Sequence, residues 1–157
     1  MAGDSRDAQV YAAHAPDLMR LATFLVGPSD APDVVSAAVV RALASPRWRG
    51  VRNPAAYLSR AVQNEARRMR KANARRTDRE QRVFSAAVPS VPDDEPDPNV
   101  LAHVRALSDR QQLVVLLTYW DDLPADAVAR RLGMSEGSVK RHLARARARL
   151  RSELDGT

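Results

Sequence analysis

The chain has no cysteine, only three histidines, few aromatic residues and no long apolar run. Without cysteine it can form neither a disulfide framework nor a thiolate metal site, and the scattered His14, His103 and His142 offer no cluster of ligands. No segment approaches the roughly 18 apolar residues of a membrane helix, and the first residues lack the apolar core of a secretory signal. We therefore expect no metal, no cofactor, no membrane insertion and a cytoplasmic location.

The patterns of an enzyme active site are also missing. We find no nucleophile with a nearby base and oxyanion donors, no glycine-rich phosphate loop and no paired-carboxylate site. The acidic cluster between residues 93 and 97 lies among prolines, where the geometry of a site cannot be held. The sequence predicts a protein that is not an enzyme.

Positive charge is what the chain has in excess, with 25 Lys and Arg and a net charge of +6. Most of these bases lie in two blocks, residues 67–82 and 130–151. Between the blocks, the stretch VPSVPDDEPDPN contains prolines and acids but no base. We predict two basic modules that flank a flexible, acidic, proline-rich linker. The linker is either disordered filler or a segment that covers a basic face before binding.

Helical periodicity organises the first module. Apolar residues recur at three- and four-residue spacing over residues 18–26 and again over 34–43. A third helix opens with Asn53 in the N-cap position and Pro54 in the first helical position. The pattern predicts a helical bundle over residues 7–82.

The second module follows a linker that we place at residues 83–99. Residues 100–107 read as a short helix, and Ser108 with Gln111 forms a capping box that opens another helix. Two further helices follow, and no alternating strand pattern of convincing length occurs. We predict an all-α protein of two small helical domains, the second over residues 100–154.

The stretch DAVARRLGMSEGSVKRHL has the spacing of a helix-turn-helix. Ala129 is small where two helices would cross, Gly133 can adopt the positive φ that ends the first helix, and Val139 would fill the shared core. Ser135 would cap the second helix. Each position has a steric reason, which favours the motif over chance spacing.

The second helix of this motif would present a basic face. With Val139 and Leu143 directed inward, four side chains face outward and can reach the major groove of DNA: Ser138, Lys140, Arg141 and Arg145. The later Arg147, Arg149 and Arg151 are better placed for phosphates. The alternative is a helical hairpin with a solvated basic face.

The first module has a basic segment of its own. From residue 64 to 82 the helix carries bases at mostly three- and four-residue steps, which predicts a face that follows phosphates or a solvated surface. The preceding loop SPRWRGVRN interleaves Trp48 with arginines, the mixture that stacks on unpaired bases. Trp48 is equally suited to filling the core beneath the loop.

Taken together, the chain resembles the extracytoplasmic-function group of sigma factors, the smallest of the σ70 family. The segment LMRLATFLVGPSDAPDVVSAAVVRAL and the following WRGVRNPAAYLSRAVQNEARRMRK resemble the family's region 2. The segment LSDRQQLVVLLTYWDDLPADAVARRLGMSEGSVKRHLARARARLR resembles region 4. The resemblance implies a subunit that joins core RNA polymerase and directs it to promoters, with region 2 on the downstream −10 element and region 4 on the upstream −35 element.

The resemblance also assigns residues. It implies a helix that binds the polymerase clamp and carries Asp33, Val34, Val35 and Arg41. It implies a loop from Trp48 through Arg49 to Asn53 that captures a flipped base of the non-template strand, helped by Asn64, Arg67 and Arg68. Ser138, Lys140, Arg141 and Arg145 would read the upstream element. The group commonly has an anti-sigma factor that covers both modules.

Two alternatives stay open at this point. One is a helix-turn-helix transcriptional regulator that binds duplex DNA without polymerase, and the other is a polymerase-binding protein without a promoter-reading role. The first alternative differs from a sigma factor in whether sequence-specific binding requires core polymerase.

Overall fold

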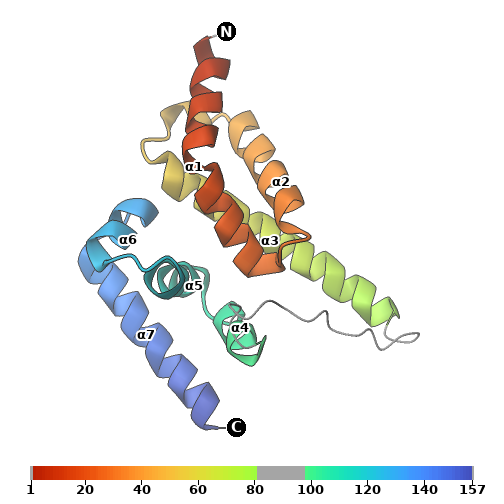
Figure 1. Ribbon diagram of the computed structural model, residues 1–157, viewed down its shortest axis with the longest axis vertical. Coiled ribbons are helices and arrows are strands. Elements are labelled where there is room, and N and C mark those ends of the chain that lie inside the picture. The colour runs from red at the N-terminus through yellow and green to blue at the C-terminus, as the bar shows by residue number, and fades with distance from the viewer. Residues whose placement is uncertain (1, 81–97, 157) are drawn as a thin grey trace. The chain divides into compact units, whose positions relative to one another are not determined.

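The computed structural model describes residues 2–80 and 98–156, and in these residues the secondary structure is helical, without a strand (Figure 1). The chain divides into two compact units, Met1–Ser85 and Ala86–Thr157. The all-α prediction with two helical domains is confirmed. Residues 83–97 of the expected linker and Arg82 lie outside the described residues, whereas Pro98 and Asn99, which were expected in the linker, begin a helix that extends to Arg105. The proposed domain boundaries otherwise stay predictions.

The first unit is built from three helices and one short turn: α1 (Ala2–Val26), α2 (Ala31–Ala44), η1 (Trp48–Gly50) and α3 (Pro54–Glu80). Each of the three helices packs against the other two. Gly27 turns the chain between α1 and α2 with a φ of 88°, a value that favours glycine. Asn53 caps α3 as predicted, because its Oδ1 accepts a 3.0 Å hydrogen bond from the Ala56 amide.

The core of this unit lies where the three helices meet. It is made of aliphatic side chains that are almost inaccessible to water, among them Leu18, Leu25, Val34, Val35, Leu58 and Val62. Burial of such side chains is the main source of stability for a small bundle.

Helix α1 is longer than its apolar pattern indicates. The sequence shows helical periodicity only from Leu18, whereas the helix begins at Ala2. Its buried residues are Leu18, Leu21, Ala22 and Leu25, so the first half lies outside the core. A mostly exposed half-helix carries no apolar stripe, and periodicity alone therefore missed it.

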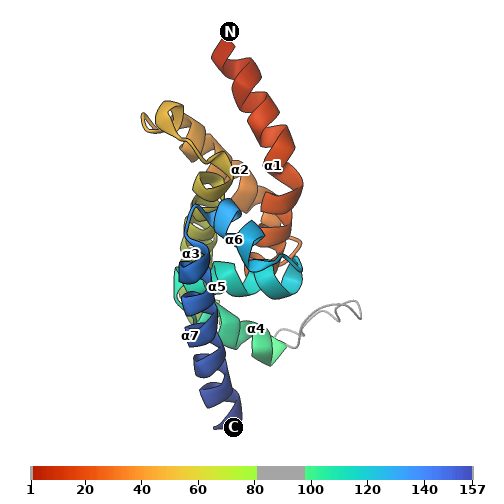
Figure 2. The ribbon, with the colours of Figure 1, turned by 90° about the vertical axis from the view of Figure 1, so that its left-hand side faces the viewer.

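The second unit contains α4 (Pro98–Arg105), α5 (Asp109–Val115), the π-helical turn η2 (Leu116–Trp120), α6 (Ala125–Leu132) and α7 (Glu136–Asp155) (Figure 2). Helix α7 packs along α5 and α6, and buried aliphatic residues such as Val114, Val128 and Val139 form the core. The capping box is confirmed, with Ser108 and Gln111 exchanging two hydrogen bonds. The buried Gln112 amide donates to the Val104 carbonyl and ties α5 to α4.

The π-helical turn η2 is the feature of this unit that the sequence did not predict. It widens the last turn of the α5 segment, and the Asp121 amide closes it on the Leu116 carbonyl at 3.1 Å. The chain then leaves through Asp122, a non-glycine residue with a φ of 56°. An unbroken apolar run gives no signal for a change of helical pitch. None of the described helices is long and apolar enough to cross a membrane.

Candidate nucleic-acid interface

The turn between α6 and α7 has the geometry predicted for a helix-turn-helix. Gly133 adopts the left-handed conformation, with φ 64° and ψ 40°, and its amide donates to the Ala129 carbonyl. The Ser135 hydroxyl accepts a 3.1 Å hydrogen bond from the Ser138 amide and caps α7. Ala129 is buried at the crossing and Val139 is fully buried. These contacts fix the start of α7 relative to α6.

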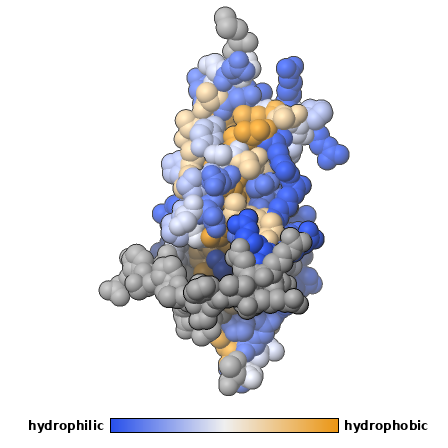
Figure 3. All heavy atoms as spheres, turned by 90° about the vertical axis from the view of Figure 1, so that its right-hand side faces the viewer, coloured by the Kyte–Doolittle hydropathy of each residue, from blue (hydrophilic) through white to orange (hydrophobic). Residues whose placement is uncertain are grey.

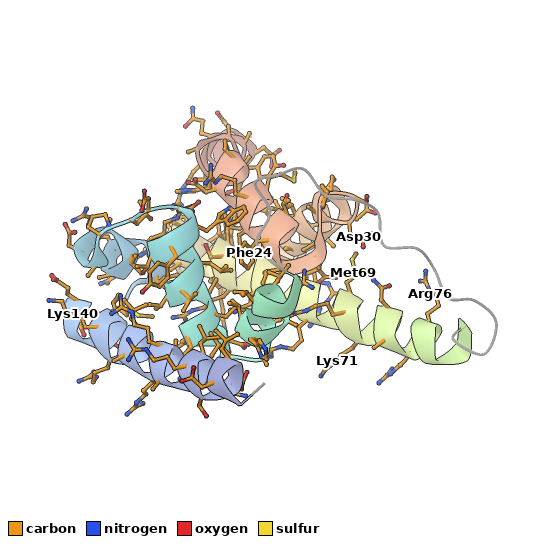
Figure 4. All side chains as sticks on the ribbon, turned by 60° about the horizontal axis from the view of Figure 1, so that its bottom comes forward. Phe24, Asp30, Met69, Lys71, Arg76 and Lys140 are labelled. Carbon is orange, nitrogen blue, oxygen red and sulfur yellow. The ribbon has the colours of Figure 1, made fainter. Side chains whose placement is uncertain are left out.

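Helix α7 presents a basic face to solvent. Lys140, Arg141 and Arg145 are exposed as predicted, whereas Ser138 is half-buried. Their contact with DNA stays a prediction. Lys140 pairs with Glu136 one turn earlier at 3.2 Å, and Figure 4 shows its side chain at the start of α7. The opposite face is held by Val139 and Ala146, while Leu143 is only half-buried.

Two of the three arginines expected on phosphates have partners within the unit. The Arg147 guanidinium lies 5.5 Å from the centre of the Tyr119 ring, and its Nε donates to the Tyr119 hydroxyl. The Arg149 Nε donates to Glu153 at 3.0 Å, and the same carboxylate contacts His103 of α4. Hydrogen bonds from Arg149 and then His103 lower the pKa of Glu153.

His142 and Arg110 lie beside the predicted basic residues of α7, where Arg110 adds positive charge and His142 favours its neutral form. Burial lowers the pKa of His142 most, and Arg110, Arg145 and Arg141 lower it further. Its Nδ1 is buried and has no hydrogen-bond partner. Arg110 belongs to α5, so its effect on His142 places a base of α5 close to α7. No sequence pattern connects these two residues, which lie 32 positions apart in the chain.

In the first unit, a pocket of about 310 Å³ opens between α2 and α3. Alanines contribute to its lining, and polar or charged side chains complete it: Ala38, Ala42 and Ala61, with Arg41, Tyr57, Arg60, Asn64, Glu65 and Arg68. Glu65 lies 3.6 Å from the Arg41 guanidinium and 3.4 Å from that of Arg68. The pocket therefore brings together Arg41, expected on the polymerase, with Asn64 and Arg68, expected on DNA.

Besides the three alanines, three polar or charged residues of this pocket were not predicted as site residues. Glu65 is the acid between two arginines, while Arg60 and Tyr57 line the pocket from earlier turns of α3. Tyr57, Arg60 and Asn64 are three or four residues apart, a spacing that places them on one face of α3. That spacing could have indicated that the three residues share a surface. It could not show that residues of α2 line the same pocket.

Trp48 is buried in the loop between α2 and α3, with 8% of its surface exposed. Its ring centre lies 5.8 Å from that of Tyr57, and its Nε1 donates a 2.8 Å hydrogen bond to Asp7. Of the two roles considered for Trp48, this packing favours the core-filling one, because stacking on a base would require the ring to leave its site. Arg49 beside it is exposed.

Helix α2 requires a correction among the expected polymerase contacts. Val34 and Val35 have 0% and 1% of their surface exposed, because both face the α1–α2–α3 core. They therefore stabilise the helix and cannot lie on its binding surface. Asp33 and Arg41 are exposed, as is Val40, which retains 67% exposure and was not predicted.

The bases of α3 are spread around the helix. Arg67 is half-buried and Arg68 exposed, and Figure 4 shows Lys71 and Arg76 pointing to different sides of the helix.

One face of the molecule, seen in Figure 3, combines a largely hydrophilic surface with smaller apolar areas. Among residues 2–80 and 98–156, no group of metal-ligating side chains is assembled.

Both units match models of known protein families. The model described as Sigma-70 region 2 matches residues 10–76, and the model described as Sigma-70, region 4 matches residues 99–150. The chain is 34% identical over 143 residues to the RNA polymerase sigma-E factor of Streptomyces avermitilis, covering 88% of this chain and 79% of that protein. It is 32% identical over 142 residues to the protein of the same name from Streptomyces coelicolor, covering 87% and 79%.

Solved structures show the same fold. The sigma factor RpoE of Bartonella quintana, determined in complex with the anti-sigma factor NepR, matches with a TM-score of 0.54 and 22% identity, covering 94% of this chain and 96% of that one. The structure of CnrH in complex with the cytosolic domain of CnrY matches with a TM-score of 0.54 and 24% identity, covering 98% and 90%.

Proposed function

The chain belongs to the σ70 family of RNA polymerase sigma factors, in its extracytoplasmic-function group, and from this membership we propose which residues contact promoter DNA and core polymerase. A sigma factor binds core RNA polymerase and directs it to promoters, and the family is in general not enzymatic. The residue assignments below rest on the geometry of each unit.

The upstream element is read by α7. The capped start of the helix and its exposed basic face are the observations that carry this assignment. We assign base-edge contacts to Ser138, Lys140, Arg141 and Arg145, because the first turns of a recognition helix lie deepest in the major groove. Arg110 of α5 and Arg147 of α7 supply phosphate contacts.

The downstream element is bound by the pocket between α2 and α3. The alanines leave room for a flat base, and Asn64 with Arg68 offers hydrogen-bond donors at the rim. Arg49, Asn53 and Arg67 contact the strand on either side of that base. Trp48 supports the loop from within, in agreement with its burial.

Core polymerase is bound by the exposed side of α2. Asp33 and Arg41 supply charge, and the exposed Val40 supplies apolar area in the same helix. Because its partner is core polymerase, we place the protein in the cytoplasm. An anti-sigma factor is a further proposed partner, supported by the related fold of the Bartonella quintana sigma factor that was solved with one.

Affinity capture of purified core polymerase, followed by run-off transcription from genomic fragments with and without the protein, tests these roles. We expect stable binding and new start sites that share an upstream and a downstream element. Arg141→Ala is expected to lose discrimination at the upstream element, and Arg68→Ala at the downstream one. Sequence-specific binding to duplex DNA by the protein alone, without capture of polymerase, would instead identify a stand-alone regulator.

A further inference from the structure

The loop between α2 and α3 is shaped by short-range hydrogen bonds and one side chain. The Trp48 amide donates to the Ser45 carbonyl at 3.0 Å, and the Val51 amide donates to the Trp48 carbonyl at 3.1 Å, which closes the single turn η1. Asn53 then caps α3. Only Trp48 of these residues is buried, so its indole is the anchor that fixes the loop to the unit.

The indole is held at its polar edge by a residue from the beginning of the chain. Its Nε1–H donates to the Asp7 Oδ1 at 2.8 Å across 41 residues of sequence. A hydrogen bond from a neutral donor to a carboxylate is stronger than one between neutral groups. If Asp7 were lost, a largely buried donor would be left without its acceptor, and the ring would rotate or hydrate to recover one.

The surroundings of this hydrogen bond are open. The first turns of α1 and the chain from Leu43 to Arg49 line a groove of about 720 Å³, and both Asp7 and Trp48 lie on its wall. The buried residues of α1 begin only at Leu18, well beyond Asp7. Figure 1 shows the loop beside the first half of α1. The hydrogen bond therefore spans a region where packing alone does not hold helix and loop together.

We propose that Asp7 is a positioning residue for promoter melting, and that its carboxylate holds Trp48 and thereby the loop that binds the unpaired strand. This proposal rests on the proposed function of the loop Trp48–Asn53. It gives the exposed first turns of α1 a role in DNA capture that is separate from polymerase binding, because Asp33 and Arg41 lie on α2.

Three variants of the full-length protein separate this role from general stability. Asp7→Leu removes the acceptor and keeps a side chain of similar size. Asp7→Asn keeps an acceptor oxygen for the indole. Asp4→Leu is the matched control, because Asp4 lies on the same helix and lines the same groove.

The surroundings of the indole are followed by its N–H resonance in nuclear magnetic resonance spectra. The chain has two tryptophans, so only two indole signals need to be distinguished. Trp120→Phe assigns the Trp48 signal. We expect a clear shift of this signal in Asp7→Leu, a smaller one in Asp7→Asn and none in Asp4→Leu.

Function is measured with core polymerase at a promoter found by run-off transcription, by the permanganate reactivity of unpaired thymines and by competition for core polymerase. We expect Asp7→Leu to lower promoter opening about tenfold, which corresponds to a free-energy change of about 1.4 kcal/mol. Asp7→Asn should restore at least half of the opening. The affinity of every variant for core polymerase should lie within twofold of the wild-type value. On a promoter that is already melted, the variants should rank in the same order of activity as on the duplex promoter.

Normal promoter opening by Asp7→Leu, with a shifted indole signal, would overturn the proposal. The proposal would also be overturned if Asp7→Leu and Asp7→Asn lost promoter opening equally and in proportion to their loss of thermal stability. If the wild-type protein neither binds core polymerase nor opens a promoter, the proposed function itself fails and this inference fails with it. The indole signal would then still report whether Asp7 holds Trp48.

Discussion

The two units position the elements that we propose bind nucleic acid in different ways. In the second unit, the start of α7 is fixed by residues close to one another in sequence: Ala129, Gly133, Ser135 and Val139. In the first unit, the loop and the pocket depend on contacts between separate helices, from Asp7 to Trp48 and from Arg41 to Glu65. A local motif can be recognised in sequence, whereas contacts across a bundle appear only once the helices are packed.

The largest effect should come from removing the anchor of the first unit. Trp48→Ala deletes a buried aromatic ring and should lower the free energy of unfolding by about 3–5 kcal/mol. Urea unfolding of the full chain, followed by circular dichroism, measures this loss. Trp48→Phe keeps most of the packing and is the control. An unchanged free energy of unfolding for Trp48→Ala would contradict the core-filling role of the ring.

Arg141→Ala should have the next largest effect, confined to the second unit. If Arg141 contacts a base edge, its removal should cost about 1–3 kcal/mol at the preferred upstream element and much less at altered sequences. Arg147→Ala, which loses a side chain stacked on Tyr119, should weaken binding to all sequences alike. Competition binding by holoenzyme on duplexes with single substitutions distinguishes the two patterns. Uniform loss for Arg141→Ala would make it a phosphate contact.

The local design of the second unit is tested by Gly133→Ala. A side chain at a φ of 64° is strained, so the substitution should lower the free energy of unfolding by about 1–2 kcal/mol. The exposed basic side chains of α7 are unchanged in this variant. Thermal unfolding measures the cost, and Gly137→Ala is the control because Gly137 lies inside a helix with open space for a methyl group. Equal stability of wild type and Gly133→Ala would contradict the role given to the turn.

Glu65→Gln tests the contacts between helices that shape the pocket of the first unit. Glu65 lies 3.4 Å from the guanidinium of Arg68, which we propose contacts the downstream element. Neutralising Glu65 should therefore free Arg68 for the DNA and raise the affinity of holoenzyme for the single-stranded downstream element about two- to fivefold. Fluorescence anisotropy over a range of salt concentrations measures this gain. Asp30→Asn makes the same change in net charge away from the pocket lining. Weaker binding by Glu65→Gln would mean that the carboxylate positions Arg68 for DNA.

The smallest expected effect is a dependence on pH in the second unit. The pKa of His142 is lowered below 6.5 by burial and by Arg110, Arg145 and Arg141, so protonation opposes folding. The stability that neutral His142 contributes is present above pH 6.5 and is lost as the pH falls through its lower folded-state pKa. DNA phosphates favour the charged ring, so affinity for duplex DNA should rise slightly on acidification. His142→Gln should abolish the rise in DNA affinity between pH 7.5 and pH 5.5. If the rise is unchanged in this variant, other groups cause it.

Much of the fold could be predicted from sequence because its signals are local. Asn53 and Ser108 capped helices as expected, and Gly133 and Val139 took their places in the helix-turn-helix. Side-chain orientation was harder to predict. Val34 and Val35 were assigned to a binding surface because they lie on the right helix, yet both face its core side.

The candidate site was predictable in its residue types but not in its pairings. Arg41 and Arg68 were expected in separate roles, and the packing of α2 on α3 brings both to Glu65. Asp7 lay outside every motif, because a single acid at the start of an exposed half-helix has no periodic signature. The π-helical turn at Leu116–Trp120 was hidden within a continuous apolar run.

The hydrogen bond between Asp7 and Trp48 also has a consequence for synthesis of the chain. The two residues are 41 positions apart, so a ribosome that adds 5–20 residues per second makes Trp48 about 2–8 seconds after Asp7. During that interval the first turns of α1 have no loop to hold. This hydrogen bond therefore cannot form until more than half of the first unit has been made, although its acceptor is one of the first residues to be made.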